Sequence, residues 1–214
     1  MNEETIQYYN EHAEEFCAGT IHADMSECRD RFLHYLQLGS RILDAGCGSG
    51  RDTVAFLSAG YQVDAFDASE EICRIASQRT GIPVRQQRFE ELEGQDLYDG
   101  IWACASLLHV AAEDLPDVLK RLYRLLKKSG VIYVSFKFGD GDRQKDGRYF
   151  NDMTEESLNR LLCDAGFTVK EIFITQDVRE NRGNEAWVNA IAERTSVCFS
   201  HKLQMSLFKR QNYI

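Results

Sequence analysis

Three alternating glycines follow a hydrophobic run near the start of the chain. Residues 42–52 read ILDAGCGSGRD, with Gly46, Gly48 and Gly50 placed after Asp44. Because glycine has no Cβ, it lets a strand turn tightly into a helix and lets the backbone approach a ligand closely. The segment therefore predicts a loop that binds a nucleotide-like molecule.

The spacing and charge of this loop favour one class of ligand. In the dinucleotide pattern G-x-G-x-x-G, read from Gly46 and Gly48, the third glycine would stand where the chain has Arg51. Asp44 also ends the strand near the position of a pyrophosphate, and like charges at short range repel in a partly dry site. S-adenosylmethionine fits better, because it carries a sulfonium and an ammonium, and its carboxylate can use backbone N–H groups at the next helix.

A second acidic residue ends the next predicted strand. Residues 61–66 read YQVDAF and lead into Asp67, Ala68 and Ser69. A carboxylate at the tip of the neighbouring strand, about 20 residues after a glycine loop, is where ribose hydroxyls are bound. The alternative is that Asp67 only stabilises the start of a helix whose N-cap is Ser69. After the glycine loop, we interpret Asp67 as a ribose ligand and expect Asp64 to face solvent.

From about Tyr8 to Arg194 the chain resembles the class I, Rossmann-like methyltransferases that use S-adenosylmethionine. Four stretches, GSGRDT, GY, AFDAS and ASLLHV, look similar to a bacterial group often labelled tellurite-resistance-type methyltransferases. The resemblance implies that the methionine part of the cofactor is surrounded by four residues: Asp44, Gly46, Gly48 and Gly50. It also implies that Asp67 binds the ribose.

The same resemblance places three residues beside the adenine: Ala68, Phe89 and Glu90. Many relatives carry an Asp after the third strand, where this chain has Arg88, Phe89 and Glu90. The residue that contacts the adenine amino group therefore stays open. Phe89 stacks on the adenine, Glu90 accepts a hydrogen bond from the amino group, or Arg88 does neither and faces water.

Two cysteines belong to the predicted site. Cys47 lies in the glycine loop, and Cys104 ends the fourth strand among small residues that would pass beneath the sulfonium. We interpret both as packing residues, because methyl transfer from a sulfonium needs no enzyme nucleophile. The chain has seven cysteines and no C-x-x-C pair, which indicates reduced thiols.

His109 follows the fourth predicted strand, beside the expected methyl group. There an imidazole can accept a proton from an oxygen or nitrogen nucleophile. The alternative is a structural histidine bonded to a backbone group at the strand end. His12, His22 and His34 have no metal-like spacing, and we expect no metal site.

Residues 1–40 are predicted to form a helical lid made of two helical pieces with aromatic faces. In relatives with a similar Tyr-Tyr start the first helix lies over the cofactor, so the resemblance implies that Tyr8 or Tyr9 contacts the methionine part or the substrate. Closure of such a lid excludes water and aligns the nucleophile with the methyl group.

Residues 137–150 read KFGDGDRQKDGRYF and follow the fifth predicted strand. They are expected to form a mobile loop at the edge of the sheet where α/β proteins hold ligands. Arg148 and Tyr149 are the predicted contacts to an anionic or oxygen-rich substrate. The alternative is a solvated loop whose charges largely balance.

The hydrophobic pattern predicts an α/β, three-layer sandwich with a seven-stranded, mostly parallel sheet whose last strand is antiparallel. A helix is expected over 113–127, a strand over 131–136, a helix from Thr154 to Gly166, and two last strands near 168–174 and 186–192. Residues 41–194 would form one methyltransferase domain under the lid. We do not assign a role to the tail at 195–214.

Composition excludes several classes of function. The 214 residues are 43% hydrophobic, enough for one large domain, and the net charge of −9 argues against general nucleic-acid binding. Without a long apolar stretch or a basic and apolar leader, we expect no membrane association and a cytoplasmic location. Oligomeric state is left open.

The sequence thus predicts an S-adenosylmethionine-dependent methyltransferase that acts on a small-molecule acceptor by direct in-line transfer. The alternatives are a non-catalytic S-adenosylmethionine-binding protein and a nicotinamide-dependent oxidoreductase. The acceptor atom stays open.

Overall fold

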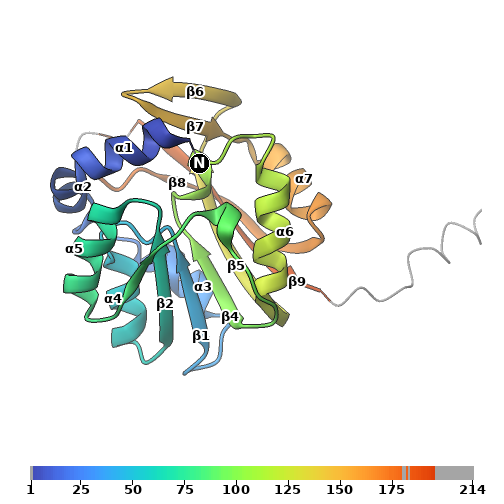
Figure 1. Ribbon diagram of the computed structural model, residues 1–214. Coiled ribbons are helices and arrows are strands. Elements are labelled where there is room, and N and C mark those ends of the chain that lie inside the picture. Colours follow the sequence, from blue (N-terminus) through green and yellow to red (C-terminus); the bar gives the residue numbers. More distant parts are fainter. Residues whose placement is uncertain (1, 180–181, 183, 196–214) are drawn as a thin grey trace, which may run out of the picture.

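A computed structural model describes residues 2–179, 182 and 184–195. These residues form a three-layer α/β sandwich around a seven-stranded sheet, as Figure 1 shows. The strand order is β3-β2-β1-β4-β5-β9-β8. In chain order the bounds are β1 Arg41–Ala45, β2 Gln62–Asp67, β3 Val84–Gln86, β4 Tyr98–Ala103, β5 Leu126–Lys137, β8 Phe167–Gln176 and β9 Ala186–Arg194.

The direction of the strands confirms the predicted sheet. β9 pairs antiparallel with both β5 and β8, whereas the pairs among β1 to β5 are parallel. A short connection joins β8 to β9, and such a connection can only produce an antiparallel pair. Among the described strands of this sheet, β9 alone runs against the others.

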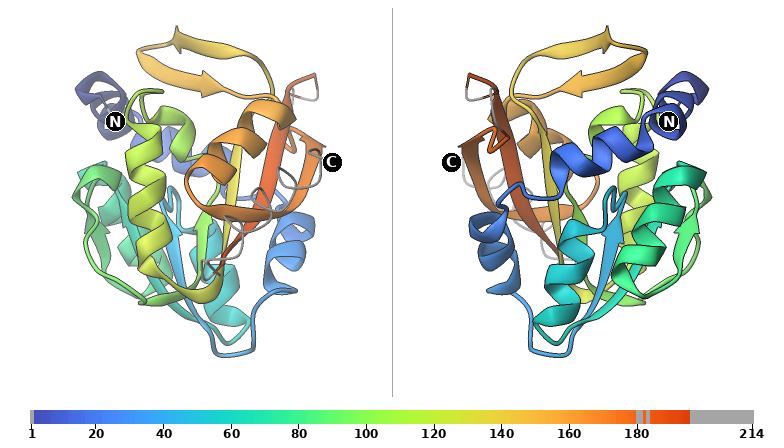
Figure 2. Two further views of the ribbon diagram at one scale, coloured as in Figure 1. Left: turned by 90° about the vertical axis from the view of Figure 1, so that its right-hand side faces the viewer. Right: turned by 90° about the vertical axis from the view of Figure 1, so that its left-hand side faces the viewer.

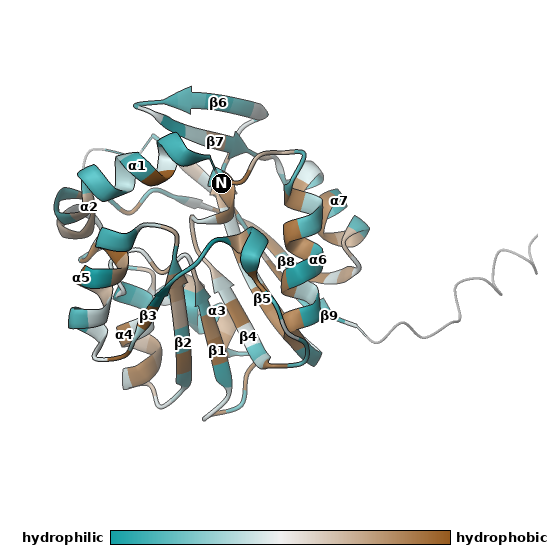
Figure 3. Ribbon diagram, in the orientation of Figure 1, coloured by the Kyte–Doolittle hydropathy of each residue, from teal (hydrophilic) through white to brown (hydrophobic). Residues whose placement is uncertain are grey.

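Helices cover both faces of the sheet. On one face Ile42, Trp102 and Tyr133 pack with Phe32 and Phe56 of the helices α3 and α4. The other face contributes alternate strand residues to the main core, which α6 and α7 complete. Figure 3 shows the hydrophobic colouring along the strands and on the inner sides of these helices. The helix bounds are α1 Glu3–Glu11, α2 Ala13–Thr20, α3 Ser26–Leu33, α4 Arg51–Ser58, α5 Glu70–Thr80, α6 Leu115–Leu125 and α7 Glu155–Asp164, with short 3-10 turns η1 Phe89–Glu91 and η2 Leu107–His109.

The boundary between α6 and β5 differs from the prediction. The helix ends at Leu125, and the strand begins at once at Leu126, which is buried and pairs with Tyr98. Leucines at helical spacing are buried along α6: Leu115, Leu119, Leu122 and Leu125. Thr154 caps α7 as expected, because its side chain accepts a hydrogen bond from the Ser157 N–H.

The prediction of a mobile loop at 137–150 is wrong. The segment holds most of an antiparallel hairpin, β6 (Gly141–Lys145) and β7 (Arg148–Asp152). Asp146 and Gly147 form its turn with φ of 52° and 74°, the pair of positive angles that a two-residue hairpin turn requires. Figure 2 shows this hairpin at the same end of the molecule as α1.

The N-terminal segment contains three helices where two helical pieces were expected. Helices α1 and α2 lie beside α5 at the carboxyl ends of the parallel strands, and α1 also contacts β7. Helix α3 instead packs on the face of the sheet. Residues 196–214, which include nearly all of the predicted tail, lie outside the described residues. Within the described part of the chain, no helix is long and apolar enough to cross a membrane.

Candidate active site

A cavity of about 530 Å³ opens at the carboxyl ends of the parallel strands. It is lined by the loops after β1, β2 and β4, by the N-terminal helices α1 and α2, for which we keep the name lid, and by the β6–β7 hairpin. Open α/β sheets hold their ligands at this edge, and the volume is typical of a small-molecule site.

The glycine loop turns from β1 into α4 along the wall of this cavity. Gly46, Gly48 and Gly50 have φ of 77°, 52° and 72°, where other residues are strained. Gly46 and Gly48 line the cavity, but Gly50 does not. A Cβ at Gly50 would lie 2.7 Å from Thr80 Cγ2, so this glycine permits the packing of α4 against α5.

Asp67 joins the end of β2 to the glycine loop. Its carboxylate accepts the N–H of Gly48 and the N–H of Ser69, each at 3.1 Å. Ser69 is the N-cap of α5, as the alternative interpretation required, and it also donates a hydrogen bond to Asn10 of the lid at 2.6 Å. Burial raises the pKa of Asp67 although the backbone N–H groups oppose this. Asp67 thus lies in the cavity wall and also accepts the N–H of the N-cap residue of α5.

Asp44 is a buried carboxyl at the floor of the cavity. Its Oδ2 accepts a hydrogen bond of 2.6 Å from the hydroxyl of Thr53 in α4. Burial, followed by the neighbouring negative charge of Asp52, raises the pKa of Asp44 to about 7. A cation placed beside Asp44 would favour its ionised form.

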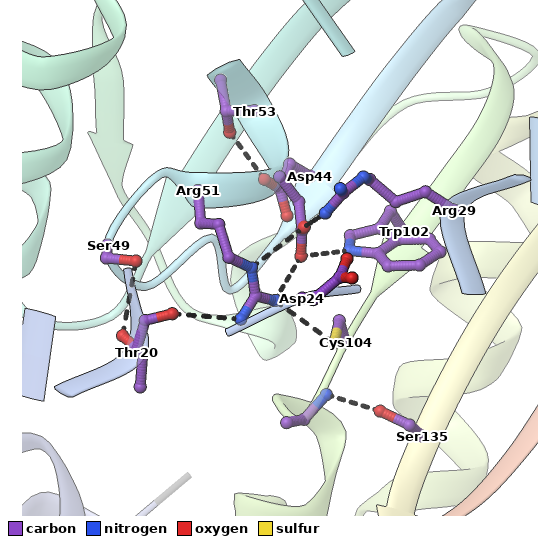
Figure 4. A network of polar contacts seen from close by, with 12 residues as sticks. Thr20, Asp24, Arg29, Asp44, Ser49, Arg51, Thr53, Trp102, Cys104 and Ser135 are labelled. Carbon is purple, nitrogen blue, oxygen red and sulfur yellow. Dashed lines mark hydrogen bonds and ion pairs between the residues drawn. The ribbon is translucent and has the colours of Figure 1, made fainter. Parts of the chain in front are cut away.

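A buried ionic network that the sequence did not predict links the lid to the floor (Figure 4). Asp52 is paired with Arg51 at 2.6 Å and with Arg29 of α3 at 2.7 Å, and it accepts the indole N–H of Trp102 at 3.0 Å. Arg51 also donates to the carbonyl of Thr20 at 3.3 Å. Burial alone raises the pKa of a carboxyl, but the two arginines hold the pKa of Asp52 below its usual range. Only the Arg-Asp pair after the third glycine signalled this network in the sequence.

Two of the three residues predicted to lie beside the adenine line the cavity. Ala68 and Phe89 line the cavity, and Phe89 packs edge-on against Phe66 with ring centroids 5.2 Å apart. Glu90 does not line the cavity. Arg88 does line it and forms a 2.6 Å ion pair with Glu3 of α1, instead of facing only water.

His109 is buried between the lid and the hairpin. Its Nδ1 lies 2.7 Å from the carbonyl oxygen of Tyr149, which can only accept, so Nδ1 carries the proton. Its Nε2 lies 2.8 Å from the hydroxyl of Tyr9, which therefore donates to it. Burial lowers the pKa of His109 to about 4, and burial raises the pKa of Tyr9 to about 12. The pair is thus a neutral imidazole and a neutral phenol at pH 7.

The two residues predicted to contact the substrate differ in their position relative to the cavity. Arg148 lines the cavity. The side chain of Tyr149 is not part of the lining, and its hydroxyl accepts the N–H of Ala112 at 3.2 Å. The backbone of Tyr149 instead ties the hairpin to two elements, through His109 and through the hydroxyl of Thr5 in α1, which accepts the Tyr149 N–H at 3.1 Å.

Both predicted cysteines line the cavity as protonated thiols. Burial raises the pKa of Cys104 to about 12 and the pKa of Cys47 well above its usual value. A thiol is a poor nucleophile until it ionises, so neither residue is poised for covalent catalysis. Within residues 2–179, 182 and 184–195, no group of three or more His, Cys, Asp or Glu side chains has the arrangement of a metal site.

Known proteins resemble this chain in fold and in sequence. The family model described as a methyltransferase domain matches residues 42–130. The chain also superposes on 1,6-didemethyltoxoflavin-N1-methyltransferase of Burkholderia thailandensis, solved with S-adenosylhomocysteine, with a TM-score of 0.70 and 26% identity over 90% of this chain and 91% of that one. The chain is an S-adenosylmethionine-dependent methyltransferase.

Curated relatives of this methyltransferase agree with the assignment. An uncharacterized methyltransferase of Staphylococcus carnosus is 23% identical over 178 residues, which cover 78% of this chain and 86% of that protein. A ubiquinone biosynthesis O-methyltransferase of Rickettsia typhi is 31% identical over 109 residues, 48% of this chain and 44% of that enzyme. The second alignment spans less than half of its relative. The predicted enzyme class and cofactor are confirmed, and a nicotinamide-dependent oxidoreductase is set aside.

The side chains of the methyltransferase suit a cationic adenosyl cofactor. Two carboxylates, Asp44 and Asp67, lie in the cavity wall beside the backbone of Gly46 and Gly48. The aromatic ring of Phe89 lines the end beyond Asp67. These groups offer negative charge, backbone N–H groups and an aromatic surface, and the two carboxylates would repel a diphosphate placed beside them.

Proposed function

We propose that this methyltransferase modifies a small-molecule acceptor by direct in-line transfer. The observation that carries the proposal is the extent of the cavity, which continues from the glycine loop past His109 to Arg148, Asp177 and Trp187. It therefore offers a second compartment beyond the residues assigned to the cofactor. When bound, S-adenosylmethionine supplies an activated methyl group on a sulfonium. The acceptor nucleophile would form a bond to this methyl group while the S–CH3 bond breaks and S-adenosylhomocysteine leaves.

The assignment of individual residues to the cofactor is part of this proposal. Asp67 would bind the ribose, and Asp44 with the loop of Gly46, Cys47 and Gly48 would surround the methionine part. Ala68 and Phe89 would flank the adenine, and Cys104 would lie beneath the sulfonium. Gly50 and Glu90 do not line the cavity. Gly50 would affect cofactor binding through the shape of the glycine loop, and Glu90 would affect it through neighbouring residues.

We assign the lid a role in alignment. Tyr9, Phe16 and Thr20 of α1 and α2 line the cavity and cover it. Covering helices exclude water and restrict the approach of an acceptor, which lowers the entropic part of the barrier. Of the two roles left open for His109, the hydrogen bonds to Tyr9 and Tyr149 favour positioning over general base catalysis, because both ring nitrogens already have partners.

The resemblance to the tellurite-resistance-type group stays a prediction from the sequence and indicates no acceptor. Its four stretches lie in the glycine loop, around β2 and after β4. None of them lies in the hairpin or in β8 and β9, which line the second compartment.

Methyl tracing tests the proposed function. The protein is incubated with methyl-labelled S-adenosylmethionine and, in separate reactions, with the dialysable metabolites, the RNA and the proteins of a bacterial extract. We expect labelled product in the dialysable fraction, with one S-adenosylhomocysteine formed for each label transferred. Label confined to RNA or protein would contradict the small-molecule acceptor.

A further inference from the structure

Charge is distributed unevenly along the cavity. We name its second compartment the acceptor chamber, lined by the hairpin, the end of β5 and residues 174–179, 182, 185 and 187. Two carboxylates, Asp177 and Glu185, line it together with six cationic side chains: Lys137, Arg143, Lys145, Arg148, Arg179 and Arg182. This excess of positive charge stands in a chain of net charge −9, whereas carboxylates predominate around the glycine loop.

Part of this positive charge is neutralised inside the protein. The Nζ of Lys137 lies 2.7 Å from Asp177 and 2.5 Å from Glu185, and Arg179 pairs with the same Asp177 at 2.6 Å. Arg143 binds Asp152 through two hydrogen bonds of 2.5 and 3.2 Å. These close pairs satisfy the three cations and build the wall of the chamber.

Arg148 differs from these cations. Its side chain is only 14% exposed, and the nearest carboxylate, Asp146, is 62% exposed and lies 3.6 Å from Nη2. The Nε atom is buried without a hydrogen-bond partner among the described residues. A buried donor without a partner destabilises the folded protein, and more strongly when the group is charged. The guanidinium therefore gains free energy if a ligand supplies an acceptor.

Aromatic rings hold this guanidinium in place. The Cζ of Arg148 lies 4.2 Å from the ring centroid of Tyr8 and 5.3 Å from that of Phe150, distances typical of cation–π contacts. Tyr9, Phe150 and Trp187 line the cavity around the chamber. A fixed guanidinium favours a planar carboxylate, which it can bind through two parallel hydrogen bonds, and aromatic walls favour a flat ring.

We propose that the methyl acceptor is an aromatic carboxylate whose carboxyl group binds Arg148 in the acceptor chamber. The inference rests on the proposed function, since it names the acceptor class of the same site. The carboxylate binds the guanidinium, and the ring lies against the aromatic walls. The methyl group is then transferred to a different group on the ring, because the carboxylate is bound to Arg148.

A pair of isosteric probes tests the inference. Benzoate and uncharged benzamide are titrated into protein saturated with S-adenosylhomocysteine, and binding is followed by ligand-observed NMR. We expect benzoate to bind at least about tenfold more tightly than benzamide, the ratio that one charge-assisted hydrogen bond provides. In Arg148→Gln the ratio falls to within about twofold, whereas the exposed Arg160→Gln of α7 keeps the ratio of the natural protein.

A second variant of Arg148 and the binding of S-adenosylhomocysteine distinguish a failure of this inference from a failure of the proposed function. Arg148→Lys keeps the charge and should retain a reduced preference for benzoate, which also answers the case in which Arg148→Gln does not fold. Equal binding of both probes by the natural protein, no binding of benzoate, or an unchanged ratio in Arg148→Gln would overturn the inference. If S-adenosylhomocysteine itself does not bind, the proposed function fails instead.

Discussion

The hydroxyl of Tyr9 donates a hydrogen bond of 2.8 Å to Nε2 of His109 and so ties the lid helix α1 to the turn after β4. Tyr9→Phe removes this bond and leaves Nε2 without a donor. We expect the free energy of unfolding to fall by about 1 kcal/mol and the amides of α1 to exchange faster in hydrogen exchange mass spectrometry.

The neighbouring Tyr8→Phe is the matched control for this prediction. Its ring stacks on His12 and contacts Arg148, and phenylalanine keeps both ring contacts. We expect little change in the exchange of α1. Equal exchange in the two variants would show that the Tyr9 to His109 bond does not hold the lid.

A pH dependence of stability follows from the burial of His109. Burial lowers its pKa from 6.5 to about 4, so between these values the unfolded chain binds a proton that the folded chain does not. Stability must therefore fall as pH falls, by about 2 kcal/mol from this group between pH 7 and pH 5. Asp44, whose pKa is raised to about 7, has the opposite effect over the same range, so the contribution of His109 is measured as a difference between variants. In urea unfolding, the natural protein and the exposed control His34→Gln should each lose about 2 kcal/mol more stability from pH 7 to pH 5 than His109→Gln does. The same loss in His109→Gln would assign it to other groups.

Asp67→Ala tests the ribose assignment. Calorimetry should show S-adenosylmethionine binding weakened by about 1–3 kcal/mol, because hydrogen bonds to the ribose are not made and the Gly48 N–H loses its partner. Asp64→Ala is the control on the same strand, since Asp64 instead pairs with Arg41 at 2.6 Å. Unchanged affinity in Asp67→Ala would reject this role.

Asp44 makes cofactor binding depend on pH. Its pKa, raised to about 7 mainly by burial, should fall when a cation binds beside it, so binding releases a proton below pH 7. The Kd for S-adenosylmethionine should then decrease as pH rises from about 5.5 to 7, by at most about tenfold per pH unit. In Asp44→Asn this slope should disappear. A slope that persists there would mean that another group releases the proton.

Gly46 and Gly39 have nearly the same φ, so substitutions at these positions separate the cost of a left-handed backbone from the cost of steric crowding. Gly46 has φ of 77°, and a Cβ there would lie 2.5 Å from the Cβ of Ser106, whereas Gly39 has φ of 82° and nothing within 4 Å. Gly39→Ala should cost about 1–2 kcal/mol of stability for its left-handed conformation. Gly46→Ala should cost more in the same urea unfolding experiment, and equal costs would refute the close approach of the loop to Ser106.

The sheet and the cofactor end could be predicted because their signals are local. The glycine spacing, the acidic end of β2 and the N-cap Ser69 all lie within short segments, and the leucine stripe of α6 repeats at helical spacing. Even the hairpin had a local signal, the Asp146–Gly147 pair, which was interpreted as a mobile loop.

The other features of the site depend on contacts between segments that lie far apart in the sequence. Asp52 receives partners from α3 and β4, which sequence spacing alone does not bring together. The outward position of the Tyr149 side chain follows from the alternation of β7, whose register is set by its pairing with β6. His109 could be placed at the site from the sequence, but its two partners come from α1 and β7.

The central claim is that the glycine loop and Asp67 bind a cationic adenosyl compound and not a diphosphate. Calorimetric titration of the natural protein with S-adenosylmethionine, S-adenosylhomocysteine and NADH tests it most directly. The account predicts saturable heats for the two adenosyl amino acids and none for NADH. Saturable binding of NADH with no heat from S-adenosylmethionine would contradict it.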